Sequence, residues 1–148
     1  MSYEKILLTT DGSERSEAAI DQAVELTRKF DAKLHILYVV DIGVDSSYES
    51  VADLMSQLES VENFEEIGKR AIESIQEQVE EKGLTPEIAI KRGVPHKKIL
   101  GYANEEDLDL IIMSTHGRSG LDRMLLGSVT EKVIRSSKIP VLTVTIEE

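Results

Sequence analysis

The sequence predicts an α/β domain with a doubly wound five-stranded parallel sheet, helices on both faces and the strand order 3-2-1-4-5. Five short runs rich in aliphatic and β-branched residues alternate along the chain with four amphipathic helical patterns. The most apolar of these runs, Leu108–Met113, is typical of a strand that is covered on both faces. The length of 148 residues suits one core, so we expect a single domain over residues 1–148.

The first strand is expected at Ile6–Thr10 and the first helix at Glu14–Phe30. The strand run stops at the turn cluster Asp11-Gly12-Ser13, after which apolar residues recur at helical spacing. Ser13 is the expected N-cap residue of this helix, because its hydroxyl can accept a hydrogen bond from a first-turn amide. A strand therefore feeds directly into a helix here.

A second strand is expected at Leu34–Val40, and one amphipathic pattern then persists from Val51 to Lys82. As one helix this pattern would be roughly 48 Å long, against about 20 Å for a strand. We therefore expect a break or a projecting first part, with Val61–Lys82 docked on the sheet. Gly83 is the expected residue just past its end, because glycine accepts the left-handed conformation that closes helices.

The remaining elements follow in the same alternation. Glu87–Lys91 is the expected third strand, and Pro95 suits the first turn of the helix that follows. After the apolar strand, a last helix is expected at about Val129–Ser137 and a final strand at Val141–Ile146. One face of that final strand is less apolar than the other, which suits a sheet edge or a subunit contact.

Composition excludes several classes of function. The 17 Lys and Arg against 28 Asp and Glu give a net charge of −11, so we expect neither nucleic acid nor an anionic membrane as a partner. The absence of cysteine excludes thiolate metal sites and thiol catalysis. The amino-terminal residues lack the pattern of a signal peptide, and no apolar run approaches the thickness of a bilayer, so we expect a cytoplasmic protein.

Two segments could carry a binding site. In doubly wound folds ligands bind at the carboxyl ends of the strands, where the strand order reverses. Thr9-Thr10-Asp11-Gly12-Ser13 follows the first strand, and its Asp11 carboxylate could accept hydrogen bonds from a ribose or a base. The alternative is that Asp11 only stabilises a turn or caps a helix. The second segment, Met113–Gly120, leaves the most apolar strand.

Glycines follow that second segment in a pattern that suits phosphate. Gly117, Gly120 and Gly127 allow a close approach of the backbone to a ligand. The amides of Ser128, Val129 and Thr130 open a helix whose dipole favours anions. The alternative is a capping box between Ser128 and Glu131. Neither a P-loop pattern nor G-x-G-x-x-G occurs, so those nucleotide motifs are not supported.

With these residues the chain resembles the universal stress protein family over nearly its whole length. Nucleotide-binding members of that family carry G-x-x-G, nine further residues, and then Gly followed by Ser or Thr. Gly117 and Gly127-Ser128 match the second half of this pattern, whereas Ser114 stands at its first glycine. Asp11 after a strand, the segment Leu37–Val40, Gly93-x-Pro95 and the run Thr115–Leu121 are also similar.

The resemblance implies an ATP or AMP site in a dimeric, nucleotide-dependent module of the stress response. Asp11 and the backbone of Val39 would lie near the adenosine, while Ser114 and Gly117 would flank the ribose and phosphates. Amides and hydroxyls at residues 127–130 would hold the phosphates, with Mg or Mn bridging phosphate oxygens. The homodimer would pair through Val141–Ile146. The expected nucleotide-binding residues are Thr9, Thr10, Asp11, Val39, Met113, Ser114, Gly117, Gly127, Ser128, Val129 and Thr130.

Two other functions stay open. One is a slow ATPase or autophosphorylating protein, for which the only carboxylates near the expected phosphates are Asp122 and Glu131. The other is a dimeric interaction module in which Ser114 marks a lost nucleotide site. We expect no catalytic residue and no metal site from the protein alone. The three histidines are widely spaced at His35, His96 and His116.

The negative charge is unevenly distributed. Residues 114–138 carry a local charge of +3, so the chain is locally positive where phosphates are expected. The acidic helical pattern Val51–Lys82 either forms a solvated face or binds a partner through its first half, and the role of Asp45–Ser60 stays open. The charge balance therefore excludes nucleic acid more firmly than it excludes a nucleotide.

Overall fold

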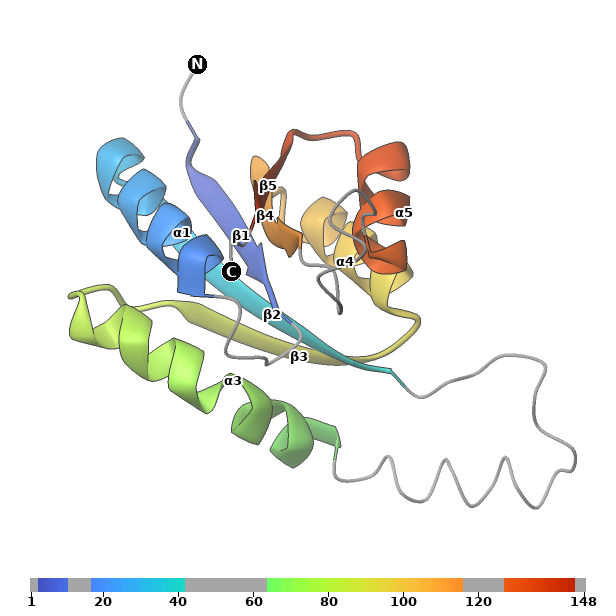
Figure 1. Ribbon diagram of the computed structural model, residues 1–148, viewed down its shortest axis with the longest axis horizontal. Helices are drawn as coiled ribbons and strands as arrows, with labels where there is room; N and C mark the ends of the chain where they lie inside the picture. Colours follow the sequence, from blue (N-terminus) through green and yellow to red (C-terminus); the bar gives the residue numbers. More distant parts are fainter. Residues whose placement is uncertain (1–2, 11–16, 42–63, 116–126, 146–148) are drawn as a thin grey trace, which may run out of the picture.

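The computed structural model describes residues 3–10, 17–41, 64–115 and 127–145 (Figure 1). Its five strands form one parallel sheet in the order β3-β2-β1-β4-β5, which confirms the predicted fold class and strand order. The elements are β1 Lys5–Thr9, α1 Glu17–Phe30, β2 Lys33–Asp41, α3 Phe64–Glu81, β3 Glu87–Gly93, α4 Pro95–Glu105, β4 Leu110–Thr115, α5 Ser128–Ser136 and β5 Val141–Thr145.

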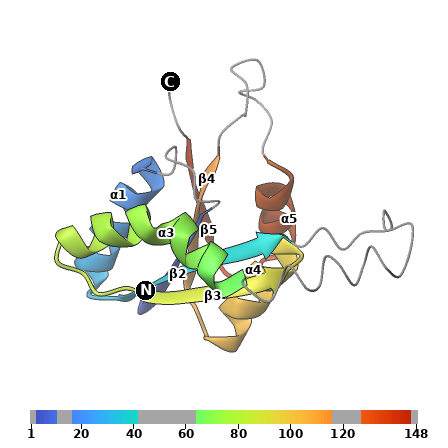
Figure 2. The same cartoon turned by 90° about the horizontal axis from the view of Figure 1, so that it is seen from below.

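The helices cover both faces of the sheet, two on each. Figure 2 shows α1 and α3 on one side of the strands and α4 and α5 on the other. Consecutive residues of β1 divide between the two cores, since Ile6 and Leu8 face α1 and α3 while Leu7 faces α4 and α5. This division explains why the inner strands are continuously apolar rather than alternating.

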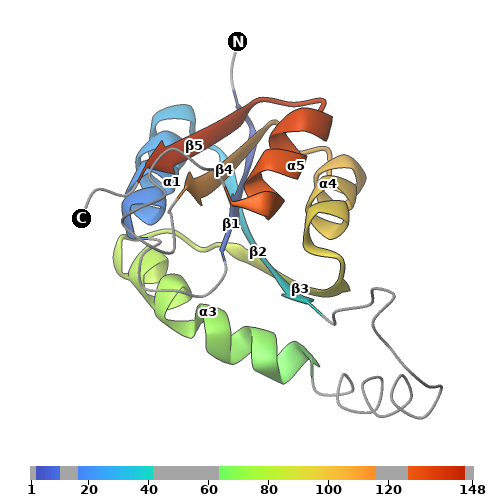
Figure 3. The ribbon, with the colours of Figure 1, turned by 45° about the vertical axis from the view of Figure 1, so that its right-hand side comes forward.

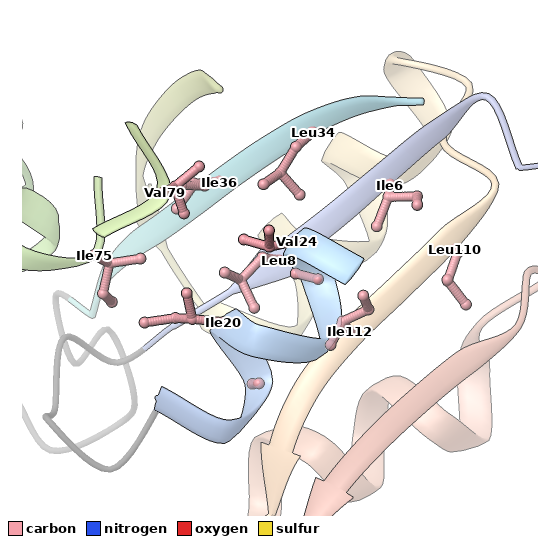
Figure 4. Packing of buried hydrophobic residues seen from close by; sticks show 12 residues of the cluster. Ile6, Leu8, Ile20, Val24, Leu34, Ile36, Ile75, Val79, Leu110 and Ile112 are labelled. Atoms are coloured by element: carbon pink, nitrogen blue, oxygen red, sulfur yellow. The ribbon is translucent and has the colours of Figure 1, made fainter. Parts of the chain in front are cut away.

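The core beneath α1 and α3 joins both helices to the middle of the sheet. Figure 4 shows Ile20 and Val24 of α1 beside Leu8 of β1, and Ile75 and Val79 of α3 farther along the same face. All five side chains are 3% exposed or less. Burial of this apolar surface is what holds the two helices against the strands.

Helix α3 is the docked part of the long amphipathic pattern. At Gly68 it passes so close to β3 that an added Cβ would lie 2.4 Å from Cγ2 of Ile90. The docking predicted for Val61–Lys82 is thus observed over Phe64–Glu81. Residues 42–63 lie outside the described residues, so the predicted break and the role of Asp45–Ser60 stay predictions.

Three helices end in the same way, which we call a closure: a residue of positive φ follows the helix, and the backbone N of the next residue donates to a carbonyl of the last turn. Gly83 follows α3 with φ +88°, as predicted, and Leu84 N donates to Val79 O at 3.4 Å. Asp31 after α1 and Asp107 after α4 have φ values of 51° and 53°, which the sequence did not predict. The equivalent bonds there run from Ala32 N to Thr27 O and from Leu108 N to Ala103 O, both at 2.9 Å.

These closures lie at the side of the sheet where strands begin, which we call the amino edge; the strands end at the carboxyl edge. Asp109, just before β4, links the starts of β1 and β4 at the amino edge. Its Oδ2 accepts hydrogen bonds from the backbone N of Glu4 at 2.8 Å and of Lys5 at 2.9 Å. In return, Asp109 N donates to Lys5 O at 2.8 Å. The two central strands are therefore fastened together where they start.

Candidate functional site

The strand order reverses between β1 and β4, and the candidate site lies at the carboxyl edge of this pair. From β1 the chain continues to β2 on one side, whereas from β4 it continues to β5 on the other. Leu8 of β1 lies beside Ile112 of β4 in register. The residues that follow them, Thr9 and Met113, therefore lie on adjacent strands near the carboxyl ends of those strands. The structure therefore brings the described starts of the two predicted segments, Thr9-Thr10 and Met113–Thr115, together at the position where such folds bind ligands.

Buried side chains lie directly beneath the candidate site. Thr9 is 7% exposed and Met113 is 5% exposed, while Thr10 and Ser114 are half-buried. Thr10 N donates to Leu37 O at 3.4 Å, so the chain leaves β1 still held beside β2. Ser114 lies beside Val144 of β5. A ligand here would rest on strand ends rather than enter the core.

Helix α5 begins at the same edge, and no side chain caps its amino end in the described residues. Its N-cap residue is Gly127, with φ −60° and ψ 151°, which has no side chain to accept from the first-turn amides. Glu131 N makes the first helical bond, to Gly127 O at 3.0 Å. The amides of residues 128–130 have no partner within the helix, and the helix dipole adds positive potential there.

The capping box considered between Ser128 and Glu131 is wrong. Because the helix begins at Ser128, that residue is inside the first turn rather than at the N-cap, and Glu131 lies one position too late. Glu131 instead pairs with Arg135, with 2.6 Å between Oε1 and Nη2. Among the described residues, neither Ser128 nor Glu131 caps the first-turn amides of α5.

The predicted phosphate residues differ in exposure. Gly127 and Ser128 are exposed, Val129 is half-buried against the α4 and α5 core, and Thr130 is 7% exposed. A Cβ built on Gly127 meets no described atom within 4 Å, so open space lies in front of it. Backbone amides and the Ser128 hydroxyl are the groups that the first turn presents to a ligand.

Val39 lies on β2, two residues before its carboxyl end. Its side chain packs against the core beneath α4 and α5, which leaves the backbone of Val39 for the predicted ligand contact, and that contact stays a prediction. Asp11 and Gly117 lie outside the described residues, and their roles stay predictions. The same holds for His116 and for Asp122.

Cations at the amino end of α4 were not included in the predicted site. Figure 3 shows α4 and α5 side by side on one face of the sheet. Burial, followed by the charges of Lys132 and Lys97, lowers the pKa of His96 near the start of α4. The signal was present in the sequence, because Lys97 and Lys98 follow Pro95 at a helix start, where cations are disfavoured.

The other described histidine lies at the amino edge, away from the site. His35 on β2 is 2% exposed, and its Nδ1 lies 2.8 Å from the Tyr102 hydroxyl of α4 and 3.7 Å from Oε2 of Glu87. Burial lowers the pKa of His35, an effect that Glu87 and Glu106 oppose. Burial also raises the pKa of Tyr102 to about 12, so its hydroxyl stays protonated.

Residues 3–10, 17–41, 64–115 and 127–145 contain neither a clustered set of metal ligands nor a helix that could span a membrane. In these ranges no group of three or more His, Asp or Glu residues could hold a metal ion. None of the helices formed by these residues is long and apolar enough to cross a membrane.

Comparisons with known proteins identify relatives over nearly the whole chain. The model of the Universal stress protein family matches residues 2–145. Universal stress protein MJ0531 of Methanocaldococcus jannaschii is 38% identical over 144 residues, covering 96% of this chain and 82% of the relative.

Solved structures agree with these sequence matches. The structure of MJ0577 from the same organism has 33% identity and a TM-score of 0.80, covering 100% of this chain and 99% of that one. A universal stress protein in complex with cAMP has 26% identity and a TM-score of 0.70, covering 99% of this chain and 100% of that one.

Proposed function

The chain belongs to the universal stress protein family, and from that premise we propose that it binds an adenine nucleotide, ATP or AMP, at the carboxyl edge between β1 and β4. The observation that carries the proposal is the uncapped amino end of α5 beside the reversal of strand order. That arrangement combines free amide donors, a favourable helix dipole and the usual ligand position of the fold. The related structure that holds cAMP supports the same class of ligand.

Each part of the nucleotide has a counterpart in the chain. Asp11 and the backbone of Val39 would contact the adenosine, with Thr9, Thr10 and Met113 beneath it. Ser114 and Gly117 would flank the ribose and phosphates. The first turn of α5, at residues 127–130, would hold phosphate oxygens with amides and the Ser128 hydroxyl. When Mg or Mn accompanies the nucleotide, it neutralises part of the phosphate charge.

The proposed role is regulatory, within a cytoplasmic homodimer that pairs through Val141–Ile146. β5 is an edge strand of the sheet, with Leu142 and Val144 half-buried against the α1 and α3 core. A second copy could pair along that edge and cover these side chains. Nucleotide occupancy would act on the segment at residues 117–127 and so alter partner binding.

A Gly127→Val variant tests the site. Its Cβ meets no described atom within 4 Å, and the extended backbone of Gly127 suits valine, so the fold should be unaffected. A bound phosphate would occupy the same space, so the variant should lose the calorimetric signal that wild-type protein gives with ATP and Mg.

The matched control is Gly101→Val on α4, which also faces open space but lies toward the far end of its helix. It should bind ATP as the wild type does. Absence of binding heat from wild-type protein at high micromolar ATP would contradict the proposal, as would an unchanged signal from Gly127→Val.

A hydrolytic role has weaker support. Glu131 is paired with Arg135 and so is not free to act as a base. Mass spectrometry of the nucleotide released on denaturing the purified protein separates the remaining possibilities. An intact adenine nucleotide supports binding, its hydrolysis product after incubation supports an ATPase, and no nucleotide supports an interaction module.

A further inference from the structure

The core beneath α4 contains a histidine that the proposed function does not use. His35 of β2 is 2% exposed, and its Nδ1 lies 2.8 Å from the Tyr102 hydroxyl of α4. The other buried polar side chains of the described residues are threonines. Imidazole is the side chain that gains or loses a proton near neutral pH, so a buried histidine can couple the fold to pH.

Two groups compete for Nδ1 of His35. Glu87 lies directly beside His35 in register, on β3, and its Oε2 is 3.7 Å from Nδ1. That distance is too long for a hydrogen bond, whereas the 2.8 Å to Tyr102 is a normal one. The Glu87 side chain is 61% exposed, so it can approach Nδ1 without repacking the core. Nδ1 therefore has one partner and a second close by.

The tyrosine is the donor when His35 is neutral. Burial raises the pKa of Tyr102 to about 12, so its hydroxyl keeps the proton at neutral and acid pH. A phenol donates to the lone pair of an unprotonated ring nitrogen, which places the ring proton of His35 on Nε2. The two rings also meet edge to face, with centroids 5.8 Å apart. These contacts fasten the last turns of α4 to β2.

A proton on Nδ1 removes the acceptor of this hydrogen bond. Nδ1 of an imidazolium is a donor without a lone pair, so the Tyr102 hydroxyl can no longer donate to it. A buried cation needs an anionic partner, and a carboxylate accepts a stronger hydrogen bond from it than a neutral phenol does. Within the described residues, Glu87 is the carboxylate that lies within 4.0 Å of Nδ1.

The other charges near His35 come from the elements packed around it. Glu106, just past α4, favours the protonated ring, whereas Lys5 of β1 and Lys33 of β2 oppose it. Lys5 Nζ donates to Glu106 O at 3.1 Å. Lys33 Nζ donates to Thr85 O at 3.2 Å. Burial has the largest effect and lowers the pKa of His35 from its ordinary 6.5, so the ring takes up its proton in mild acid.

We propose that His35 is a proton-operated switch: in acid its Nδ1 exchanges Tyr102 for Glu87, and the last turn of α4 is released from β2. The switch is independent of the nucleotide site, which lies at the other edge of the sheet. The turn that it releases contains two closure bonds, from Glu106 N to Tyr102 O at 3.0 Å and from Leu108 N to Ala103 O at 2.9 Å. Both bonds should open more often once Tyr102 has lost its partner.

The direction of two shifts tests the exchange of partners. The His35 ring is titrated by NMR in the wild type, Tyr102→Phe, Glu87→Gln and the control Glu77→Gln, which changes an exposed glutamate of α3 across the sheet. Because Tyr102 bonds only to the neutral ring, Tyr102→Phe should raise the midpoint by about half a pH unit or more. Because Glu87 bonds only to the protonated ring, Glu87→Gln should lower it by a similar amount. The control should leave it unchanged.

Hydrogen exchange at the Glu106 and Leu108 amides measures the release of the turn. After correction for the intrinsic pH dependence of exchange, wild-type protection should fall about tenfold as His35 is protonated. At the same pH, Glu87→Gln should keep that protection.

Several results would overturn the proposal. A midpoint that Tyr102→Phe lowers or leaves unchanged would show that the tyrosine also accepts from the protonated ring. Equal shifts in Glu87→Gln and Glu77→Gln, protection that does not follow the titration, or a His35 ring that stays neutral until the whole protein unfolds would also contradict it. If Tyr102→Phe does not fold, the shift in Glu87→Gln and the exchange of the two amides decide.

Discussion

The amino edge and the carboxyl edge of the sheet are built from the same strands but use their polar groups differently. At the amino edge, Asp109 accepts two backbone hydrogen bonds, and Lys5 Nζ donates to Glu106 O at 3.1 Å. At the carboxyl edge, Gly127 and Ser128 are exposed at a helix start without a side-chain cap. The amino edge pairs its donors within the protein, whereas the described part of the carboxyl edge has no side-chain cap for the first-turn amides of α5, which are the donors of the proposed site.

The difference separates stability from binding. Hydrogen bonds that satisfy charged or buried groups contribute to the free energy of unfolding, whereas donors left for a ligand contribute to affinity instead. Substitutions at the amino edge should therefore change stability and leave nucleotide affinity unchanged. Substitutions at the carboxyl edge should do the reverse.

The largest loss of stability is expected for Asp109→Ala. The change removes the acceptor of two charge-assisted bonds to Glu4 N and Lys5 N, and should cost about 2–3 kcal/mol in chemical denaturation. Asp109→Asn keeps one carbonyl acceptor and should lose less. Equal stability of Asp109→Ala and wild type would show that the amino edge is not fastened in this way.

A smaller loss is expected for Tyr102→Phe. Removing the hydroxyl leaves Nδ1 of buried His35 without its 2.8 Å partner, which should cost about 1–2 kcal/mol. Adenine nucleotide affinity should stay within error of the wild type, because the pair lies at the amino edge. A change in affinity without a change in stability would contradict the division between the edges.

Acid should also weaken the amino edge through His35. Its pKa is lowered in the folded protein by burial, so below about pH 6.5 the unfolded chain binds a proton that the folded protein does not. Stability is therefore full above that pH and falls as the pH drops below it. Lys5 and Lys33 add to the lowering, while Glu87 and Glu106 oppose it.

Melting temperatures from pH 7.5 to about pH 5.5 measure this slope. The His35→Gln variant should show a smaller change of melting temperature over this pH range, whether or not the substitution itself changes stability. Burial, followed by Lys132 and Lys97, also lowers the pKa of His96, so His96→Gln is the matched variant and should remove only its own share. A wild-type melting temperature that stays constant over this range would count against the prediction.

A modest gain is expected for Asp107→Gly. Asp107 adopts φ 53°, which costs less for glycine than for a residue with a Cβ, so stability should rise by about 0.5 kcal/mol. Gly83→Asp places aspartate in the same type of closure, at φ +88°, and should lose a similar amount. A gain in stability for Asp107→Gly and a loss for Gly83→Asp, both measured by urea denaturation, would confirm that the two helices end in the same closure.

The smallest change in stability is expected for Ser128→Ala, within about 0.5 kcal/mol, because its side chain is exposed and does not occupy the N-cap. ATP affinity should fall severalfold. At the other end of α5, the Ser137 hydroxyl donates to Ile139 O at 2.7 Å and accepts from Ile139 N at 3.1 Å. Ser137→Ala should therefore lose about 1 kcal/mol with ATP affinity unchanged.

The fold could be predicted because its signals are local. Five apolar runs between four amphipathic patterns leave few arrangements of a parallel sheet, and Gly83 marks a helix end by residue type alone. Asp31 and Asp107 make the same closure with a residue that is also common in ordinary turns, so sequence could not separate them. The capping box was wrong for a related reason, since the S-x-x-E pattern does not fix which residue is the N-cap.

The candidate site could be predicted only in part. Thr9 and Met113 meet because strand order brings their strands together, which the pattern anticipated. Helices α4 and α5 pack side by side on one face of the sheet, and this packing is set by long-range contacts that no local pattern reveals. The cations at the start of α4 were visible in the sequence, but their meaning depended on what lies beside that helix.

The bridge made by Asp109 also has a consequence for synthesis of the chain. Glu4 and Asp109 are 105 positions apart, so the central strand β1 acquires its second neighbour only after most of the chain has been translated. At typical rates this interval lasts roughly 5–20 s. During it, β1, β2 and β3 can assemble while the β4 side of β1 stays open. Until β4 is translated, the backbone groups along that edge of β1 have no strand to pair with.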